Sequence, residues 1–345
     1  MTHELKNIVN AFLNAQAEGV QAVLATVVDL DGSSYRKPGV RMLIKENGEM
    51  VGAVSGGCVE KEVYRQALSV FQNGQSKMMT YDGRYRLGCE GILYILLESF
   101  HPEQDFIVAF QNCIKTRRPF DIVSFYDRKV GENLGIGSTF CFDEKQIFNC
   151  SQNILLNEEL PSLEQKIPLR FQLIIIGAEH DAVELCLVAS FNGWEVTVVT
   201  SINNPKTIND FPGAEKVISF EPNKFSTLPT DDQTAVVVMT HNFAQDLNYL
   251  IQLPNRSLSY VGLLGPVKRR EEIISQLLDQ QPDIDPIFLD HLYGPAGLNI
   301  GAVTPQEIAT SIVAEILSVT RKTSPKSLST SNNIISESVE TINSF

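Results

Sequence analysis

The sequence has few cationic residues and no long apolar run. Of its 345 residues, 28 are Lys or Arg and 41 are Asp or Glu, so the net charge is −13 at pH 7. Because nucleic-acid binding needs clustered cations against the phosphate backbone, this balance argues against a nucleic-acid partner. No run reaches the roughly 18 apolar residues that span a bilayer. We therefore expect neither a nucleic-acid nor a membrane partner.

The sequence also lacks a secretion signal and a closely spaced cysteine pair. Residues 1–19 carry apolar side chains at helical spacing, and no apolar signal-peptide core follows. We therefore expect a cytoplasmic protein. None of the six cysteines forms a CxxC pair, which weakens zinc-site and disulfide interpretations. The cysteines are Cys58, Cys89, Cys113, Cys141, Cys150 and Cys186.

Residues 1–150 predict a mixed α/β domain with antiparallel strands. Apolar runs at 21–30 and 40–45 read as strands, and Asn47-Gly48 predicts a hairpin turn to a return strand. A helix is expected to begin at Cys58, with one apolar face. That face consists of Val59, Val63, Ala67, Val70 and Phe71.

The second half has a different pattern. Residues 151–170 are polar and predict a linker, and residues 171–322 alternate buried apolar strands with helices. This alternation is typical of a doubly wound parallel sheet of the Rossmann type. Thr304, Pro305 and Glu307 form a predicted capping box at the last long helix. Residues 323–345 are rich in Ser, Thr and Asn and predict a disordered tail.

A Gly/Ser turn with cations follows the first predicted strand. From residue 32 to residue 39 it reads GSSYRKPG, and Arg41 follows. Backbone N–H groups, hydroxyls and guanidinium groups together suit a phosphate or carboxylate. A solvated turn explains the same residue types, and the residue types alone favour it. The candidate cofactor-binding residues here are Gly32, Ser33, Ser34 and Arg36.

Two glycines and a cysteine precede the expected helix, where residues 55–60 read SGGCVE. The glycines let a ligand approach the backbone, and a helix N-terminus favours anions and thiolates. Cys58 is therefore our candidate catalytic thiol and soft-metal ligand. Close packing of a buried cysteine is the alternative that we consider weaker. The candidate residues here are Gly56, Gly57, Cys58 and Glu60. Cys89, in a similar glycine setting, is better explained by packing.

The turn after the strand near residue 175 resembles a dinucleotide fingerprint with two departures. It reads GAEHDA from Gly177 to Ala182, and Glu179 stands where the fingerprint needs glycine. Thr200 replaces the acid that would bond the ribose. We therefore doubt NAD binding, although Gly177 remains a candidate ligand contact. His180 is also a candidate, but an ordinary polar residue at a helix start is an equally good interpretation.

Further candidates follow the later strands of the second half. His241 ends one strand, and Lys268, Arg269 and Arg270 lie near a helix start, where cations oppose the helix dipole and so suggest a bound anion. Ligands of open α/β sheets bind at these strand ends. His241 and Arg269 are our candidates, and ordinary surface charge explains the three cations equally well.

These motifs together resemble the XdhC/CoxI family of xanthine dehydrogenase accessory factors. The N-terminal resemblance is carried by residues 25–44 and 53–63. The C-terminal resemblance is carried by residues 174–182, 236–246, 260–270 and 294–317. Typical members have glycine where this chain has Glu179 and Glu90, and an acid where it has Thr200.

The resemblance implies a factor that binds the molybdenum cofactor (molybdopterin), assists its sulfuration and delivers it to a molybdenum hydroxylase apoenzyme. It also implies a homodimer and a cysteine desulfurase as a further partner. We expect a maturation factor or chaperone rather than a dehydrogenase. The alternatives are a Rossmann-fold oxidoreductase that uses NAD(P) and a scaffold with a degenerate nucleotide site.

Overall fold

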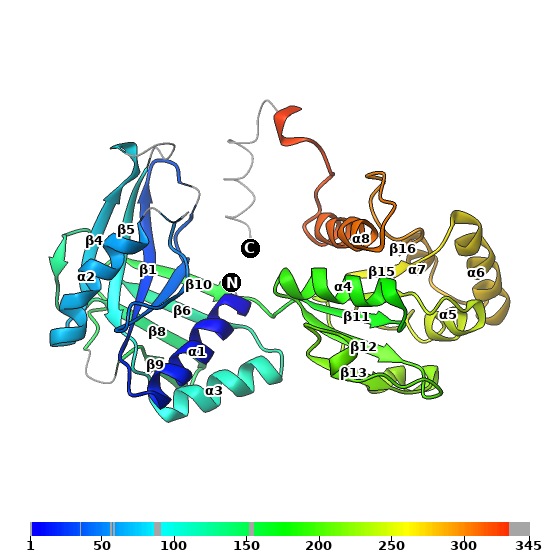
Figure 1. The fold of residues 1–345 in the computed structure, drawn as a ribbon, viewed down its shortest axis with the longest axis horizontal. Coiled ribbons are helices and arrows are strands. Elements are labelled where there is room, and N and C mark those ends of the chain that lie inside the picture. Colours follow the sequence, from blue (N-terminus) through cyan, green and yellow to red (C-terminus); the bar gives the residue numbers. More distant parts are fainter. Residues whose placement is uncertain are drawn as a thin grey trace. The chain divides into compact units, whose positions relative to one another are not determined.

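In a computed structural model, the chain divides into two compact units, residues 1–170 and 171–345 (Figure 1). The structure describes residues 2–34, 36–55, 57, 59–85, 91–151 and 155–330. No helix within these ranges is long and apolar enough to cross a membrane.

Unit 1 contains two antiparallel sheets. The first has the strand order β3-β2-β1-β5-β4-β7 and the second has the order β10-β6-β8-β9. Its helices are α1 (Thr2–Ala17), α2 (Glu60–Asn73) and α3 (Gln104–Lys115), with the 3-10 turn η1 (Gly83–Tyr85). The strands of the first sheet are β1 (Ala22–Asp31), β2 (Arg41–Lys45), β3 (Met50–Gly52), β4 (Lys77–Asp82), β5 (Ile92–Ser99) and β7 (Gly131–Glu132). Those of the second are β6 (Phe120–Phe125), β8 (Gly137–Asp143), β9 (Gln146–Asn149) and β10 (Ser162–Ile167).

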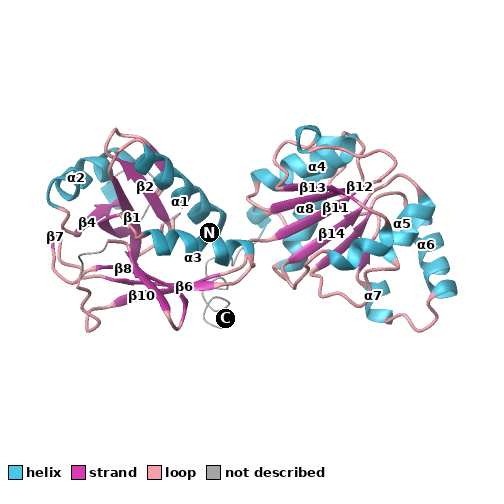
Figure 2. Cartoon of the chain, turned by 90° about the horizontal axis from the view of Figure 1, so that it is seen from below, coloured by secondary structure: helices cyan, strands magenta, loops and turns pink. Residues whose placement is uncertain are grey.

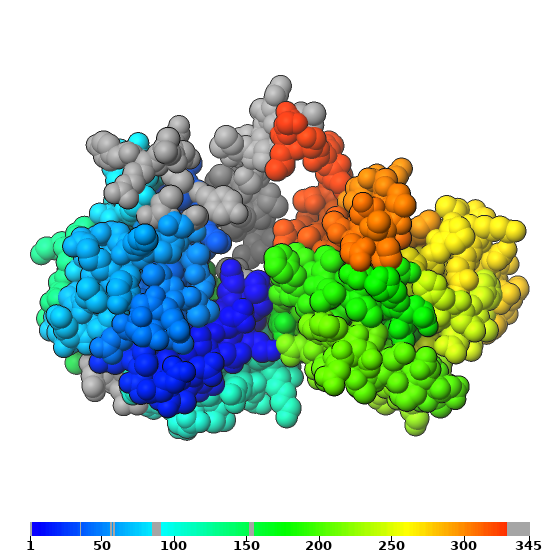
Figure 3. All heavy atoms as spheres, viewed as in Figure 1, coloured from blue at the N-terminus to red at the C-terminus, as the bar shows by residue number. Residues whose placement is uncertain are grey.

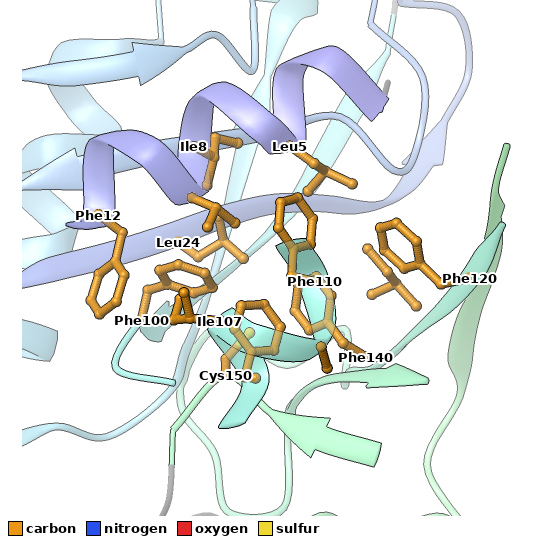
Figure 4. Close-up of a cluster of buried hydrophobic side chains, with 14 of the residues drawn as sticks. Leu5, Ile8, Phe12, Leu24, Phe100, Ile107, Phe110, Phe120, Phe140 and Cys150 are labelled. Carbon is orange, nitrogen blue, oxygen red and sulfur yellow. The ribbon is translucent and has the colours of Figure 1, made fainter. Parts of the chain in front are cut away.

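The two faces of the first sheet are buried by different partners. The strand residues Val23 and Met42 pack with Val63 and Ala67 of α2, whose outer side lies on the surface of unit 1 (Figure 3). The opposite face packs with α1, α3 and the second sheet around an aromatic cluster (Figure 4). The predicted stripe on the helix after residue 58 is confirmed, because Val59, Val63, Ala67 and Val70 are buried and Phe71 packs against them.

Two predictions about this half need correction. The helix begins at Glu60, two residues later than expected, with Val59 as its N-cap. The segment 151–170 is not a simple linker, because β10 within it pairs antiparallel with β6. Its side chains alternate between more and less exposed positions, as expected at a sheet edge, and this period was hidden by its polar composition.

Unit 2 has the predicted doubly wound parallel sheet, with the strand order β13-β12-β11-β14-β15-β16. Its strands are β11 (Gln172–Ile176), β12 (Glu195–Thr200), β13 (Lys216–Ser219), β14 (Thr234–Val238), β15 (Tyr260–Leu263) and β16 (Leu292–Tyr293). Its helices are α4 (His180–Phe191), α5 (Phe243–Leu250), α6 (Val267–Gln280), α7 (Pro286–Asp290) and α8 (Pro305–Thr320). The 3-10 turns are η2 (Ile208–Asp210), η3 (Pro222–Thr227) and η4 (Leu328–Thr330).

Helices cover both faces of this sheet (Figure 2). The side chains of α4 and α8 form one core with the strands, and those of α5 and α6 form the other. The capping box of Thr304 and Glu307 is confirmed at the start of α8. Of the predicted tail, residues 323–330 include η4, and residues 331–345 lie outside the described part of the chain.

Candidate functional site

The candidate segments of unit 1 meet at one edge of its first sheet. Strand β1 ends at Asp31 where β5 begins at Ile92, and these two residues are paired across the sheet. Strand β2 begins at Arg41 beside the end of β3, because Met42 pairs with Gly52. The loops 32–40 and 53–59 therefore leave the sheet at the same edge, together with the chain that enters β5. Gly32, Ser33, Ser34 and Arg36 lie on the first of these loops, Gly57 lies on the second, and Glu60 begins α2 directly after it.

The loop 32–40 is in close contact with the chain that enters β5. A Cβ atom built on Gly91 would lie 2.6 Å from the carbonyl oxygen of Ser33 and 2.9 Å from that of Asp31. Only glycine permits this approach without a shift of the backbone. Within the loop, the Ser34 hydroxyl accepts a hydrogen bond from the Arg36 amide at 3.4 Å. The Gly32–Arg36 turn is therefore held by local contacts on one side and by Gly91 on the other.

The start of α2 is organised by Ser55 and Glu60. The Ser55 hydroxyl donates to the Glu60 carboxylate, 2.8 and 2.9 Å away, and accepts from the amides of Gly57 and Val59. Glu60 also accepts from the amides of Ser55 and Val59. This carboxylate therefore occupies part of the hydrogen-bonding capacity that we expected an anionic ligand to use. Gly56 and Cys58 lie outside the described residues, as do Cys89 and Glu90, so the roles predicted for them remain predictions.

Arg41 is buried, whereas the sequence suggested a cation on the surface of the turn. It is only 6% exposed, and its Nη1 donates to the carbonyl of Gly39 at 3.1 Å. Burial lowers the pKa of Arg41 to about 10. Lys37 is exposed, Arg36 is half-buried with its Nε atom buried, and Arg41 belongs to the interior support of the loop.

A charged cluster that sequence reasoning missed stands at the base of this loop. Arg128 lies 2.7 Å from a carboxylate oxygen of Asp29 and 3.1 Å from one of Asp31. The hydroxyl of Tyr94 donates to Asp31 and that of Tyr126 donates to Asp29. The hydrogen bond to Asp31 raises the pKa of Tyr94. The pair of acids before Gly32 was a visible signal, but Arg128 is nearly a hundred residues away along the chain.

In unit 2 the candidate residues converge where the strand order reverses. Strands β11 and β14 are neighbours, and their following turns carry Gly177–Asp181 and His241. The His241 Nε2 atom lies 3.3 Å from Asp181, and the His180 Nε2 atom lies 3.7 Å from Glu184. Open α/β sheets typically bind ligands at this position, outside the carboxyl ends of the strands where the strand order reverses. The two histidines are thus paired with carboxylates of α4.

Three other side chains in unit 2 bear on nucleotide binding. Glu179 is exposed at the start of α4, whereas Thr200 is buried and hydrogen-bonded to Ser219 at 2.6 Å. Thr200 therefore does not present a ribose-binding group at the surface. Arg269 lies 2.6 Å from Asp246, which is buried. We expected a bound anion near Arg269, and the carboxylate of Asp246 is an anionic partner within the chain itself.

The described residues contain no group of three or more His, Cys, Asp or Glu side chains arranged to hold a metal ion. The four cysteines within this part of the chain form thiolates less readily than an ordinary cysteine. Burial raises the pKa of Cys113, Cys141 and Cys150, and raises that of Cys186 to about 11. A soft-metal ligand is therefore not expected among them.

Comparison with known proteins matches both halves of the chain. The model of the XdhC and CoxI family matches residues 15–82, and that of the XdhC Rossmann domain matches residues 173–316. The chain is 31% identical over 339 residues to a probable xanthine dehydrogenase subunit from Bacillus subtilis (strain 168). This match covers 91% of this chain and 97% of the relative.

Two further relatives extend the comparison. The molybdenum cofactor insertion chaperone PaoD of Escherichia coli (strain K12) is 22% identical over 324 residues, which cover 92% of this chain and 90% of PaoD. A crystal structure described as a xanthine dehydrogenase from Bacillus halodurans is 26% identical, with a TM-score of 0.74, over 94% of this chain and 98% of that chain. Since these similarities extend over nearly the whole sequence and both units, the chain belongs to the XdhC/CoxI family.

Proposed function

We propose that this chain is an accessory factor that binds the molybdenum cofactor, assists its sulfuration and inserts it into a xanthine-dehydrogenase-type hydroxylase. The observation that carries the proposal is that two motif loops, 32–40 and 53–59, leave the first sheet at the same edge. Family membership and the similarity to PaoD, named as a cofactor insertion chaperone, support it.

The chemistry of these loops suits the cofactor as cargo. A pterin phosphate is an anion, for which the Gly32–Ser34 turn offers backbone N–H groups and hydroxyls, and Arg36 a guanidinium. Molybdenum is bound through sulfur, and a thiolate at Cys58 is the matching soft ligand. In this proposal Cys58 lies near the metal or the transferred sulfur while a cysteine desulfurase supplies that sulfur.

The competing function, a dehydrogenase that uses NAD(P), finds less support. Glu179 places a carboxylate beside the turn that would receive the pyrophosphate, and the buried Thr200 bonds Ser219 instead of a ribose. The chain has no CxxC pair or other closely spaced cysteine run for an iron–sulfur cluster. A carrier needs neither group.

The test is to co-express the chain with cofactor biosynthesis, purify it rapidly, and measure molybdopterin content and xanthine oxidation. We expect bound pterin in the wild type and little in a Cys58→Ala, Arg36→Ala double variant. The matched control, Cys141→Ala with Lys145→Ala, should retain the pterin, since both positions are outside the loops. Equal pterin in all three proteins would contradict the proposal, and xanthine oxidation by the isolated chain would favour a dehydrogenase.

A further inference from the structure

Three polar side chains of unit 1, on strands next to the loop 32–40, have buried atoms with no hydrogen-bond partner among the described residues. These atoms are Oγ1 of Thr26, Nε and Nη2 of Arg41, and Oε1 of Gln165. Thr26 is fully buried and Arg41 is 6% exposed. Buried polar groups in native proteins are nearly always hydrogen-bonded, so a cluster of this kind needs an explanation.

The three side chains come from different strands and are linked through Arg41 and Gly39. Thr26 on β1 is directly paired with Arg41 on β2. Arg41 donates to the carbonyl of Gly39, and the amide of Gln165 on β10 packs against the same glycine. A Cβ atom at Gly39 would lie only 1.6 Å from Nε2 of Gln165. Gly39, whose φ is +97°, therefore sits between two of the three side chains.

The bonding capacities of the buried atoms are complementary. A guanidinium only donates, an amide oxygen only accepts, and a hydroxyl does both. The fully buried carboxylate of Glu98 accepts from the amide and hydroxyl of Ser138, and its charge also acts on the Arg41 guanidinium. A small molecule that both accepts and donates would satisfy the remaining atoms, and water is the one that typically fills such polar interior sites.

We propose that Thr26, Arg41 and Gln165 enclose an internal water beneath the loop 32–40, and that this hydrated guanidinium positions the turn at Gly39. Arg41 then acts as a positioning residue that holds the Gly39 carbonyl from below. The Gly39 amide is held by the carbonyl of Val27 at 2.7 Å. The loop is thereby fixed at Gly39 on both sides. Arg41 and its water hold the carbonyl, and Val27 of β1 holds the amide.

The first test uses the sign of a stability change in Thr26→Val, a substitution that keeps the shape of the side chain. Removing a hydroxyl that has no partner should stabilise the protein, whereas removing one that binds a water should destabilise it. We expect the folding equilibrium constant of unit 1 in the full chain to fall about fivefold in urea titrations. Thr80→Val, at an exposed position of β4, is the matched control and should change little. An unchanged or increased constant for Thr26→Val would overturn the proposal.

The second test measures the loop itself and needs no cofactor, so it is independent of the proposed function. Hydrogen exchange of the Gly39 amide should be at least severalfold faster in Thr26→Val and in Arg41→Met than in the wild type and in Thr80→Val. Exchange at Gly39 that stays at the wild-type rate in Thr26→Val would refute positioning through the water. The Thr26 variant decides the question even if Arg41→Met fails to fold.

Discussion

The reactivity of each cysteine depends on the pKa of its thiol, which its surroundings set. The four described cysteines are held in apolar or partly buried surroundings that raise their pKa values. Cys58 follows two glycines and precedes the start of α2, a position that favours the thiolate.

We predict that Cys58 is alkylated at least about tenfold faster than Cys113, Cys141, Cys150 and Cys186 at neutral pH, because the thiolate is the reactive form. Timed labelling with iodoacetamide, followed by peptide mapping, measures this. Labelling in denaturant provides the control, since all cysteines should then react at similar rates. Earlier modification of Cys141, the one of the four described cysteines that is not buried, would contradict the prediction.

Glu179 is the residue that most directly opposes a dinucleotide in unit 2. It is exposed at the N-terminus of α4, where backbone N–H groups would otherwise attract a pyrophosphate. We predict weak or undetectable NAD binding by the wild type and affinity on the order of tenfold higher in Glu179→Gly, because one repulsive charge is removed. Isothermal titration calorimetry measures both proteins, with Glu184→Gln as a control that leaves the turn intact. Tight binding by the wild type would be inconsistent with this view.

At the scale of elements, the helices α5 and α6, which follow β14 and β15, are joined by an ion pair between Asp246 and Arg269. Asp246 is 1% exposed and accepts from Thr240 and from Arg269, which lies near the start of α6. Removing the carboxylate leaves a partly buried guanidinium without its charge partner, and such losses typically cost about 3–5 kcal/mol.

We predict that Asp246→Ala lowers the free energy of unfolding of unit 2 by about 3 kcal/mol. Glu272→Ala breaks the exposed pair with Lys268, whose atoms are 3.8 Å apart, and should cost less than about 1 kcal/mol. Urea denaturation of both variants tests the contrast. Similar losses in the two proteins would show that Asp246 acts as an ordinary surface charge.

At the scale of the whole molecule, each unit has cores of its own. The aromatic cluster of unit 1 and the two apolar layers of unit 2 are built from residues within the respective units. A unit of this size can bury enough apolar surface to fold alone.

We therefore predict that fragments 1–170 and 171–330 each unfold cooperatively, with a single transition in circular dichroism. A fragment 1–150, cut at the boundary that the sequence suggested, should be less stable because it lacks β10 and leaves β6 as an edge strand. Equal stability of fragments 1–150 and 1–170 would show that β10 contributes little.

The sequence by itself determined the elements whose apolar period is strong. The buried runs that became β11 and β14 and the stripe that became the inner face of α2 were recognisable, because burial on one face or on both imposes a periodic pattern. The Thr304 capping box was equally local. The family resemblance rested on such contiguous motifs.

Only the tertiary structure decided which distant residues share a site. The strand order brought the loop 32–40 and the loop that leads into α2 to the same edge of the sheet, put Arg128 against Asp29 and Asp31, and buried Arg41. It also turned the polar segment around Gln165 into a strand. These outcomes depend on non-local pairing. The free energy of such a contact depends on both partners and their surroundings, so it cannot be predicted from the residue types of one segment alone.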